Sequence, residues 1–161
     1  MPATLTPING TVQNVSQFGD NCCELQVTIR NSNGIHNFIL GPDTYVVGEA
    51  RLRPGMPVTA FYDASLPIPL IFPPRYQAVI ISRRNPQENI FAGYFNENLI
   101  AADNALQLNL DRNTDIVTSN GQRFPCSPGN QMLIVYYTET TRSIPPQTTP
   151  RKVIVLCGNL V

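Results

Sequence analysis

Apolar and polar residues alternate with a period of two along most of the chain, a pattern that predicts strands. Between residues 25 and 29 every second side chain is aliphatic, and residues 35–40 carry a further set of apolar side chains. The intervening Asn33-Gly34 pair tolerates the positive φ angles of a tight turn, so a β-hairpin is expected over residues 25–40. No window of a dozen residues has apolar positions at helical spacing without a proline or glycine in it.

Strand signals recur in the same order in the two halves of the chain, as in a tandem repeat. Besides the hairpin, strands are expected over residues 8–12, 44–47, 58–62 and 77–82 in the first half and 90–95, 99–102, 105–110, 114–117, 132–137 and 153–156 in the second. Matching landmarks are Gly10 with Gly93, Thr44 with Thr114, Pro54-Gly55 with Pro128-Gly129, Tyr62 with Tyr136, residues 78–81 with 153–156 and Pro73-Pro74 with Pro145-Pro146. The chain is therefore predicted to consist of two similar units, residues 1–84 and 85–161.

Each predicted unit holds five or six short strands in roughly 75 residues. This count favours a closed or partly open barrel over a flat sheet, because closure removes most exposed edges. The fold class is expected to be all-β, with two tandem small β-barrel units of OB-like or SH3-like form. A two-layer β-sandwich is the alternative.

Charged residues make up 14% of the chain and balance at 11 basic and 11 acidic. Without a net positive field, the chain is not expected to bind nucleic acid non-specifically. Lys152 is the one lysine, whereas lysines commonly protect exposed sheet edges from pairing with other strands. This composition favours strand-to-strand assembly, with compositional drift as the other explanation.

The chain has no apolar stretch near the roughly 18 residues that a membrane-spanning helix needs. Its first residues, Met-Pro-Ala-Thr-Leu-Thr-Pro, contain neither the basic nor the apolar region of an export signal. We expect synthesis in the cytoplasm, no membrane span and no visible signal peptide.

Few side chains suit catalysis or metal binding. The single histidine, His36, lies in a predicted strand, and no G-x-S-x-G motif surrounds a serine. The adjacent Cys22 and Cys23 have a spacing that rarely lets both sulfurs bind one tetrahedral ion. The sequence therefore predicts a protein that is not an enzyme, with no catalytic residue, no metal and no cofactor.

The four cysteines are Cys22, Cys23, Cys126 and Cys157. One interpretation is that they are buried, reduced thiols of an intracellular chain. The other is covalent cross-linking between neighbouring subunits in an oxidising setting. Cys22-Cys23 lies at the open end of the predicted hairpin and Cys157 lies near the C-terminus, where both would be accessible.

The most unusual segment is Leu66-Pro67-Ile68-Pro69-Leu70-Ile71-Phe72-Pro73-Pro74. Its prolines keep it extended and out of the centre of a sheet, so its large apolar side chains must pack on something. Either the segment covers its own unit, or it is an interface loop for the other unit or a partner, formed by Leu66, Pro67, Ile68, Leu70, Ile71, Phe72 and Pro73. The corresponding residues 140–150 of the second half are mostly polar.

Four aromatic residues, Phe61, Tyr62, Tyr136 and Tyr137, offer rings of the kind that stack on bases in OB-like nucleic-acid modules. The strands around them carry almost no lysine or arginine. Nucleic acid is therefore not the expected partner.

Three motifs recur in the predicted units: Asp43-Thr44-Tyr45-Val46, then Pro54-Gly55-Met56-Pro57-Val58 with Phe61-Tyr62-Asp63, and Arg142-Ser143-Ile144-Pro145-Pro146-Gln147-Thr148. Together they resemble uncharacterised small β-barrel repeats, OB-like in appearance, of clostridial and related Firmicutes proteins. The resemblance implies a modular protein of the cell surface or of a spore coat or appendage, and it supplies no catalytic residue.

The leading functional hypothesis is a structural protein that assembles with itself or with another protein. Strand edges, the proline-rich loop and intersubunit disulfides would provide the contacts. The alternative is a soluble OB-like binding module for a peptide, a glycan or single-stranded nucleic acid.

Overall fold

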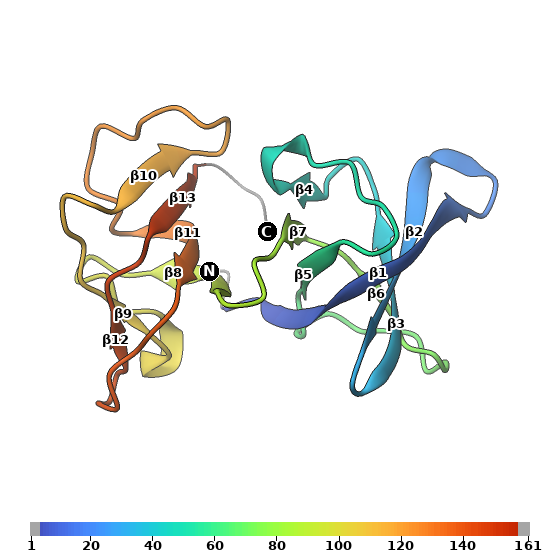
Figure 1. Ribbon diagram of the computed structural model, residues 1–161, viewed down its shortest axis with the longest axis horizontal. Coiled ribbons are helices and arrows are strands. Elements are labelled where there is room, and N and C mark those ends of the chain that lie inside the picture. The colour runs from blue at the N-terminus through green and yellow to red at the C-terminus, as the bar shows by residue number, and fades with distance from the viewer. Residues whose placement is uncertain (1–3, 158–161) are drawn as a thin grey trace. The chain divides into compact units, whose positions relative to one another are not determined.

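The computed structural model describes residues 4–157, whose regular structure is β-strand apart from two short 3₁₀ turns (Figure 1). The strands are β1 (Thr6–Phe18), β2 (Asn21–Asn31), β3 (Gly34–Leu40), β4 (Tyr45–Val46), β5 (Pro57–Tyr62), β6 (Arg75–Gln77), β7 (Ile80–Arg83), β8 (Asn89–Phe95), β9 (Gln107–Leu108), β10 (Asp115–Thr118), β11 (Gln131–Tyr137), β12 (Gln147–Thr148) and β13 (Lys152–Leu156). The turns are η1 (Val47–Glu49) and η2 (Ala102–Asn104). The all-β class predicted from the alternation is confirmed.

The described chain forms two compact units, one of residues Leu5–Asn85 and the other of Thr4 with residues 86–157. A hydrophobic core lies within each. In the first unit it comprises Val12, Val27, Ile29, Phe38, Leu40, Val58, Ala60, Ala78 and Ile81. In the second it comprises Phe95, Ala101, Leu106, Leu108, Leu133, Val135, Val153 and Val155. Both cores take mainly alternate positions along their strands, because successive side chains of a strand point to opposite faces.

The first unit is a seven-stranded sheet in the order β4-β7-β5-β1-β2-β3-β6. Strand β1 is long because it serves two ladders: its residues up to Thr11 pair with β5, and those from Thr11 onward pair with β2. Gly10 lies where β1 passes from one ladder to the other. A Cβ atom on Gly10 would lie 2.4 Å from Cγ2 of Ile29 and 2.7 Å from the carbonyl oxygen of Arg30. Strand β1 therefore approaches β2 more closely than a side chain would allow.

One stretch of chain, residues 75–83, pairs with two strands, β3 and β5, that are separated by β1 and β2 in the sheet order. Strand β6 pairs in parallel with β3, and β7, which follows it, pairs with β5 and β4. Between them, the Ala78 N–H donates to the carbonyl of Ile39 in β3 at 3.0 Å, and the Val79 N–H donates to that of Phe61 in β5 at 2.8 Å. Within the described residues the ladders form open sheets. The strands of the described residues therefore do not close into the predicted barrel.

The second unit has a four-stranded sheet, β10-β13-β11-β8, and a two-stranded sheet, β12-β9. Strands β8 and β11 pair antiparallel, as do β11 and β13, whereas β13 with β10 and β12 with β9 are parallel. In the first unit β1 with β5, β5 with β7, β7 with β4 and β6 with β3 pair in the same directions. Among the described strands β2 has no counterpart, and isolated bridges at Ile100 and Ala101 take its place.

Side-chain details also recur in the two units. The hydroxyl of Thr44 donates to the carbonyl of Ala78, and that of Thr114 donates to the carbonyl of Pro150, each at 2.8 Å. Each threonine follows a turn closed by its own N–H, which donates to a carbonyl three residues earlier. The same local bonds therefore position β4 beside β7 and β10 beside β13.

Three of the predicted correspondences are shifted. Residues 78–81 correspond to 150–153 and not to 153–156, because Ala78 and Pro150 accept the matching threonine hydroxyls.

The other two are shifted by one residue. Phe61 faces the first residue of β7 and Tyr136 faces the first residue of β13, so Tyr136 corresponds to Phe61 and not to Tyr62. Likewise the turn residue with a positive φ is Gly55 (91°) in the first unit and Asn130 (59°) in the second. Matching the two Pro-Gly pairs by residue type missed this shift, because asparagine as well as glycine accepts a left-handed backbone.

The first two strands extend further than predicted and form an arm. Strand β1 continues to Phe18 and β2 begins at Asn21, whereas the sequence predicted strands only over residues 8–12 and from Leu25. Residues 13–24, termed the arm below, are mostly exposed, but Val15 packs against the core of the unit and Arg75 of β6 lies over the Phe18 ring at 5.2 Å. No alternation of apolar and polar residues marks such a hairpin in the sequence, so the period-two signal missed it.

Two strands predicted in the second unit are shorter than expected. The strand over residues 99–102 is replaced by isolated bridges, and that over 105–110 contracts to the two residues of β9. Leu99 adopts a left-handed backbone with φ of 60° at the end of a turn closed by its N–H on the carbonyl of Asn96. A residue with a left-handed backbone interrupts a strand. Leucine rarely adopts this conformation, so the sequence does not indicate the interruption.

Candidate functional site

The loop between β5 and β6 carries most of the exposed large hydrophobic side chains among the described residues. Five of them lie within residues 66–72, termed the apolar loop: Leu66, Ile68, Leu70, Ile71 and Phe72. Leu70 and Phe72 are almost fully exposed, at 101% and 94%. The loop therefore does not fold back over its own core, and the interpretation that it covers its own unit is wrong for its outermost residues.

Both ends of this loop are held in place. At the exit from β5, the carboxylate of Asp63 accepts hydrogen bonds from the N–H and the hydroxyl of Ser65, at 2.9 and 2.6 Å. The Leu66 N–H donates to the carbonyl of Asp63 at 3.2 Å. At the other end the carbonyl of Pro74 accepts from the Asn37 N–H in β3 at 2.9 Å. Fixed ends present the apolar residues between them as a defined surface.

The composition of the loop lowers the cost of covering it. Residues 64–74 contain no charged side chain, and four of them are proline, which has no backbone N–H. A buried N–H without a partner costs free energy, so a segment with few N–H groups loses less when an apolar partner displaces its water. The loop is therefore chemically suited to an apolar contact.

An aromatic cluster lies where the loop leaves and rejoins the sheet. The rings of Tyr62 and Tyr76 stack with their centroids 4.2 Å apart, and Phe38 lies 5.1 Å from Tyr76. Burial, and then the neighbouring Tyr62, raise the pKa of Tyr76 above its ordinary value. His36 stacks on Tyr76 at 6.4 Å, and its Nε2 lies 3.2 Å from Oδ1 of Asn31. His36 is thus a residue of β3 that packs on this cluster.

The four rings considered for base stacking are not available as a stacking surface. Phe61 and Tyr136 are buried, at 0% and 6% exposed. The ring of Tyr62 is stacked on that of Tyr76. Tyr137 packs against the core of the second unit, where burial raises its pKa. The expectation that nucleic acid is not the partner remains a prediction, with these contacts in its favour.

The corresponding loop of the second unit is different. Its hydroxyls bond one another: Oγ1 of Thr141 lies 2.6 Å from Oγ of Ser143, which donates to the carbonyl of Pro145 at 2.8 Å. Its exposed large hydrophobic residue is Ile144, at 91%. The two loops share a position in the fold but present opposite surfaces, one apolar and one mainly polar.

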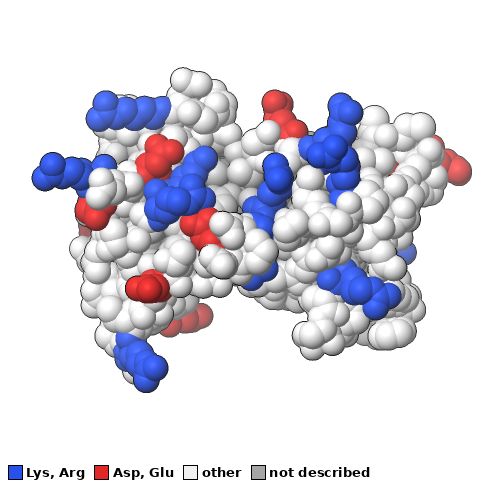
Figure 2. All heavy atoms as spheres, viewed as in Figure 1, with Lys and Arg blue, Asp and Glu red and all other residues white. Residues whose placement is uncertain are grey.

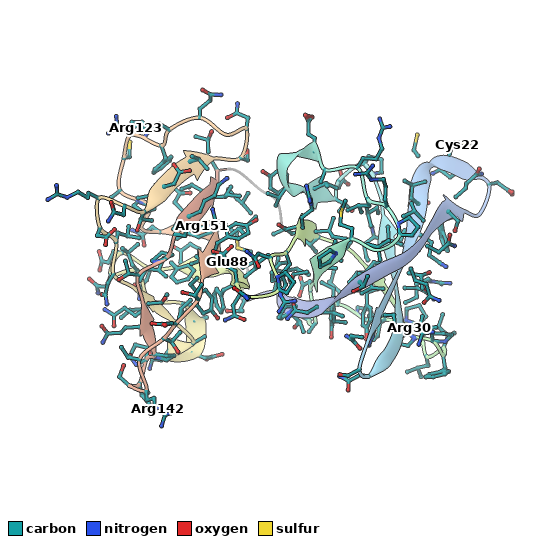
Figure 3. The ribbon with its side chains drawn as sticks, viewed as in Figure 1. Cys22, Arg30, Glu88, Arg123, Arg142 and Arg151 are labelled. Atoms are coloured by element: carbon teal, nitrogen blue, oxygen red, sulfur yellow. The ribbon has the colours of Figure 1, made fainter. Side chains whose placement is uncertain are left out.

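All four cysteines are exposed and free: Cys22, Cys23, Cys126 and Cys157. The interpretation that they are buried thiols is therefore wrong. Cys22 and Cys23 lie just beyond the open end of the hairpin over residues 25–40, where Leu25 pairs with Leu40, and on the arm near its turn. Figure 3 labels Cys22 there. Across residues 4–157 no group of three or more histidine, cysteine or acidic side chains is arranged to hold a metal ion.

Charge does not mark a site of its own. On the face shown in Figure 2, basic and acidic side chains are interspersed, with wide uncharged areas between them. In the second unit Arg151 forms a bidentate ion pair with the buried Glu88, both bonds at 2.8 Å (Figure 3). Hydrogen bonding to Glu88 raises the pKa of Arg151. This pair ties the start of β8 to the start of β13, which is a structural role.

No family model matches the chain, and neither a curated protein nor a solved structure matches it. No helix within residues 4–157 is long and apolar enough to cross a membrane. What the fold and the site define is an all-β protein with an exposed apolar loop, an exposed two-stranded arm and four accessible thiols. Sequence reasoning found the loop and the cysteines, and it missed the arm.

Proposed function

We propose that the protein is a non-enzymatic structural protein that assembles with copies of itself, with the apolar loop as a principal contact. The observation that carries the proposal is the exposure of five large hydrophobic side chains within residues 66–72. Contiguous apolar surface of this kind is rare on monomeric proteins and usually marks an interface. The anchored ends of the loop and its lack of charge support the same role.

We further propose that each unit is a partly open, OB-like barrel and that the chain arose by tandem duplication. The matching directions of strand pairing in the two units support this proposal. So do Ala78 and Val79, whose adjacent N–H groups donate to carbonyls of β3 and β5, two strands that β1 and β2 separate in the sheet order. A spore coat, an appendage or a cell surface, the settings that the family resemblance implies, would suit an assembling protein of this kind.

Measurement of molar mass in solution tests the assembly. We expect the weight-average mass of the wild-type protein, held in reductant, to rise with concentration in sedimentation or light-scattering experiments. The double variant Leu70→Ser/Phe72→Ser should stay monomeric over the same range, because it removes the two most exposed apolar side chains.

The matched control is Ile144→Ser, which removes an equally exposed hydrophobic residue from the polar loop of the second unit. It should leave the association unchanged. A wild-type protein that remains strictly monomeric at high concentration would contradict the proposal. Equal loss of association in both variants would mean that general surface hydrophobicity, not the apolar loop, drives it.

A further inference from the structure

We infer that the arm is a redox-controlled cross-linking site, at which Cys22 and Cys23 join two copies of this chain by disulfide bonds. The inference rests on the proposed self-association and identifies a second surface and its chemistry. The arm is the hairpin formed by the end of β1 and the start of β2, shown in blue in Figure 1.

The two cysteines lie in a bulge of β2. Gln17 of β1 pairs with Leu25 and the next residue, Phe18, pairs with Asn21, so residues 22–24 have no partner opposite them. The Cys23 N–H instead donates to Oδ1 of Asn21 at 2.9 Å, which orders the bulge locally. A bulge leaves its residues outside the ladder. Both thiols are accordingly exposed.

The arm is not required to build a unit of this fold. In the second unit the corresponding ladder is assembled with isolated bridges at Ile100 and Ala101 and no arm. On its outer side β2 pairs with β3 only from Leu25 onward, so residues 21–24 meet no neighbouring strand of the described chain. Residues 14–17 pair with residues 25–28 of β2, which pair in turn with β3, so only the tip of the arm, residues 18–24, extends as a two-stranded hairpin. Such a hairpin is marginally stable alone and gains stability when a partner covers it.

The chemistry of the arm selects a second copy as that partner. Cys22 and Cys23 are joined by a trans peptide bond, so their Cα atoms lie about 3.8 Å apart. An unstrained disulfide spans about 4.4–6.8 Å between Cα atoms, and a bond between these two neighbours is therefore disfavoured. The arm of another copy offers the same accessible thiols, and a two-fold arrangement brings like surfaces together.

Formation of the cross-link requires an oxidant, and a small-molecule disulfide such as oxidised glutathione supplies it. The thiolate of one copy attacks oxidised glutathione, forming a mixed disulfide and releasing one glutathione thiolate, which takes up a proton. The thiolate of the second copy then attacks the protein sulfur of the mixed disulfide and releases the second glutathione. Two protein thiols are oxidised to one disulfide, and one glutathione disulfide is reduced to two thiols.

Equilibration of the full chain with oxidised glutathione tests the inference, with intact mass and non-reducing electrophoresis as readouts. We expect a covalent dimer that reductant converts back to monomer. Peptide mapping should show disulfide bonds between Cys22 or Cys23 of one copy and Cys22 or Cys23 of the other. The double variant Cys22→Ser/Cys23→Ser should form about tenfold less dimer. Contact between the arms of two copies places these thiols, and not Cys126 or Cys157, within reach of each other.

The double variant Cys126→Ser/Cys157→Ser is the matched control, since it too removes two exposed thiols. It should form the dimer as the wild type does. Persistence of the dimer in Cys22→Ser/Cys23→Ser, its loss in the control variant, or an internal Cys22–Cys23 disulfide in a monomer would each overturn the inference.

The two proposals fail separately. If the wild type associates in reductant but forms no arm disulfide in oxidised glutathione, the cross-linking inference is wrong and the proposed self-association stands. If the wild type is monomeric in reductant at every concentration, the proposed function is wrong whatever the disulfides do. Association in reductant together with arm disulfides supports both.

Discussion

At the scale of single residues, Gly10 is the position where an added side chain would meet the closest contacts. It lies where β1 leaves β5 and joins β2, and the backbone of β1 approaches β2 closely there. Gly93 holds the corresponding place in β8, and a Cβ atom there would lie 3.1 Å from Oγ1 of Thr4 and from Cε1 of Phe91. Both glycines are explained by packing, and neither needs a functional role.

Replacement of Gly10 by alanine is expected to lower the free energy of unfolding by about 1–3 kcal/mol, the usual cost of overpacking. The added Cβ atom would meet backbone as well as a side chain, and the backbone of Arg30 cannot move aside cheaply. Urea unfolding measures the effect. Gly41→Ala is the control, because its Cβ atom would meet nothing closer than 3.6 Å. Equal stability of the two variants would show that β1 is not closely packed at Gly10.

The partly buried tyrosines make stability depend on alkaline pH. Burial raises the pKa of Tyr45 and of Tyr137 above the ordinary value of about 10. The folded state thus holds these phenolic protons more tightly than the unfolded state. Their contribution to stability is complete below the unfolded pKa and is lost as the pH rises through the higher folded pKa.

We therefore expect the free energy of unfolding to be level from neutral pH to about 9 and to decline above about 10. Urea unfolding at a series of pH values measures this dependence. The variant Tyr137→Phe should show a shallower decline, because it has one titrating group fewer. A decline that is just as steep in Tyr137→Phe would show that this tyrosine does not contribute.

At the scale of elements, the apolar loop and the arm are separable from the folded core. The core of the first unit is built by β1, β2, β3, β5 and β7 with Ala78, and it includes no residue of the apolar loop. Most of the arm is likewise exposed. Apart from Val15, which packs against the core, and Phe18, which lies under Arg75, both elements mainly add exposed surface, which is the reason for assigning them to assembly.

Substitution in the loop should therefore leave stability unchanged. Leu70→Ser/Phe72→Ser is expected to alter the free energy of unfolding by no more than about 0.5 kcal/mol, as is usual at exposed positions. Phe38→Ala, which empties a fully buried site, should cost about 3–5 kcal/mol. Thermal or urea unfolding of dilute, monomeric protein compares them. A loss in the double variant close to that in Phe38→Ala would mean that the loop supports the fold.

At the scale of the whole molecule, simple arithmetic limits what the loop can do alone. Complete burial of one large hydrophobic side chain contributes about 1.5–3 kcal/mol, so Leu70 and Phe72 together contribute roughly 3–6 kcal/mol. Association costs about 4–15 kcal/mol in lost freedom of motion. A single loop contact is therefore too weak for a lasting assembly. Symmetric use of two loops, further contacts or covalent bonds at the arm would make up the difference.

Much of the architecture could be predicted from the sequence because its signals are local. The alternation over residues 25–29 and the Asn33-Gly34 turn predicted β2, β3 and the positive φ of Gly34, which is 112°. The prolines of residues 66–74 predicted an extended apolar segment outside the sheet. Period, turn chemistry and proline each act within a few residues, so they can be read without knowing what lies nearby in space.

The tertiary structure alone decided which of these features are exposed. Whether Leu70 and the cysteines face solvent depends on residues far away in the chain, and the sequence left both readings open. The arm was invisible because most of its residues are exposed and its apolar residues do not alternate with polar ones. The change of partner by β1 at Gly10 was invisible because strand pairing is a long-range property. The sequence by itself therefore determined the all-β class and most strands, while long-range packing decided the exposure of the loop and the thiols on which the proposed assembly rests.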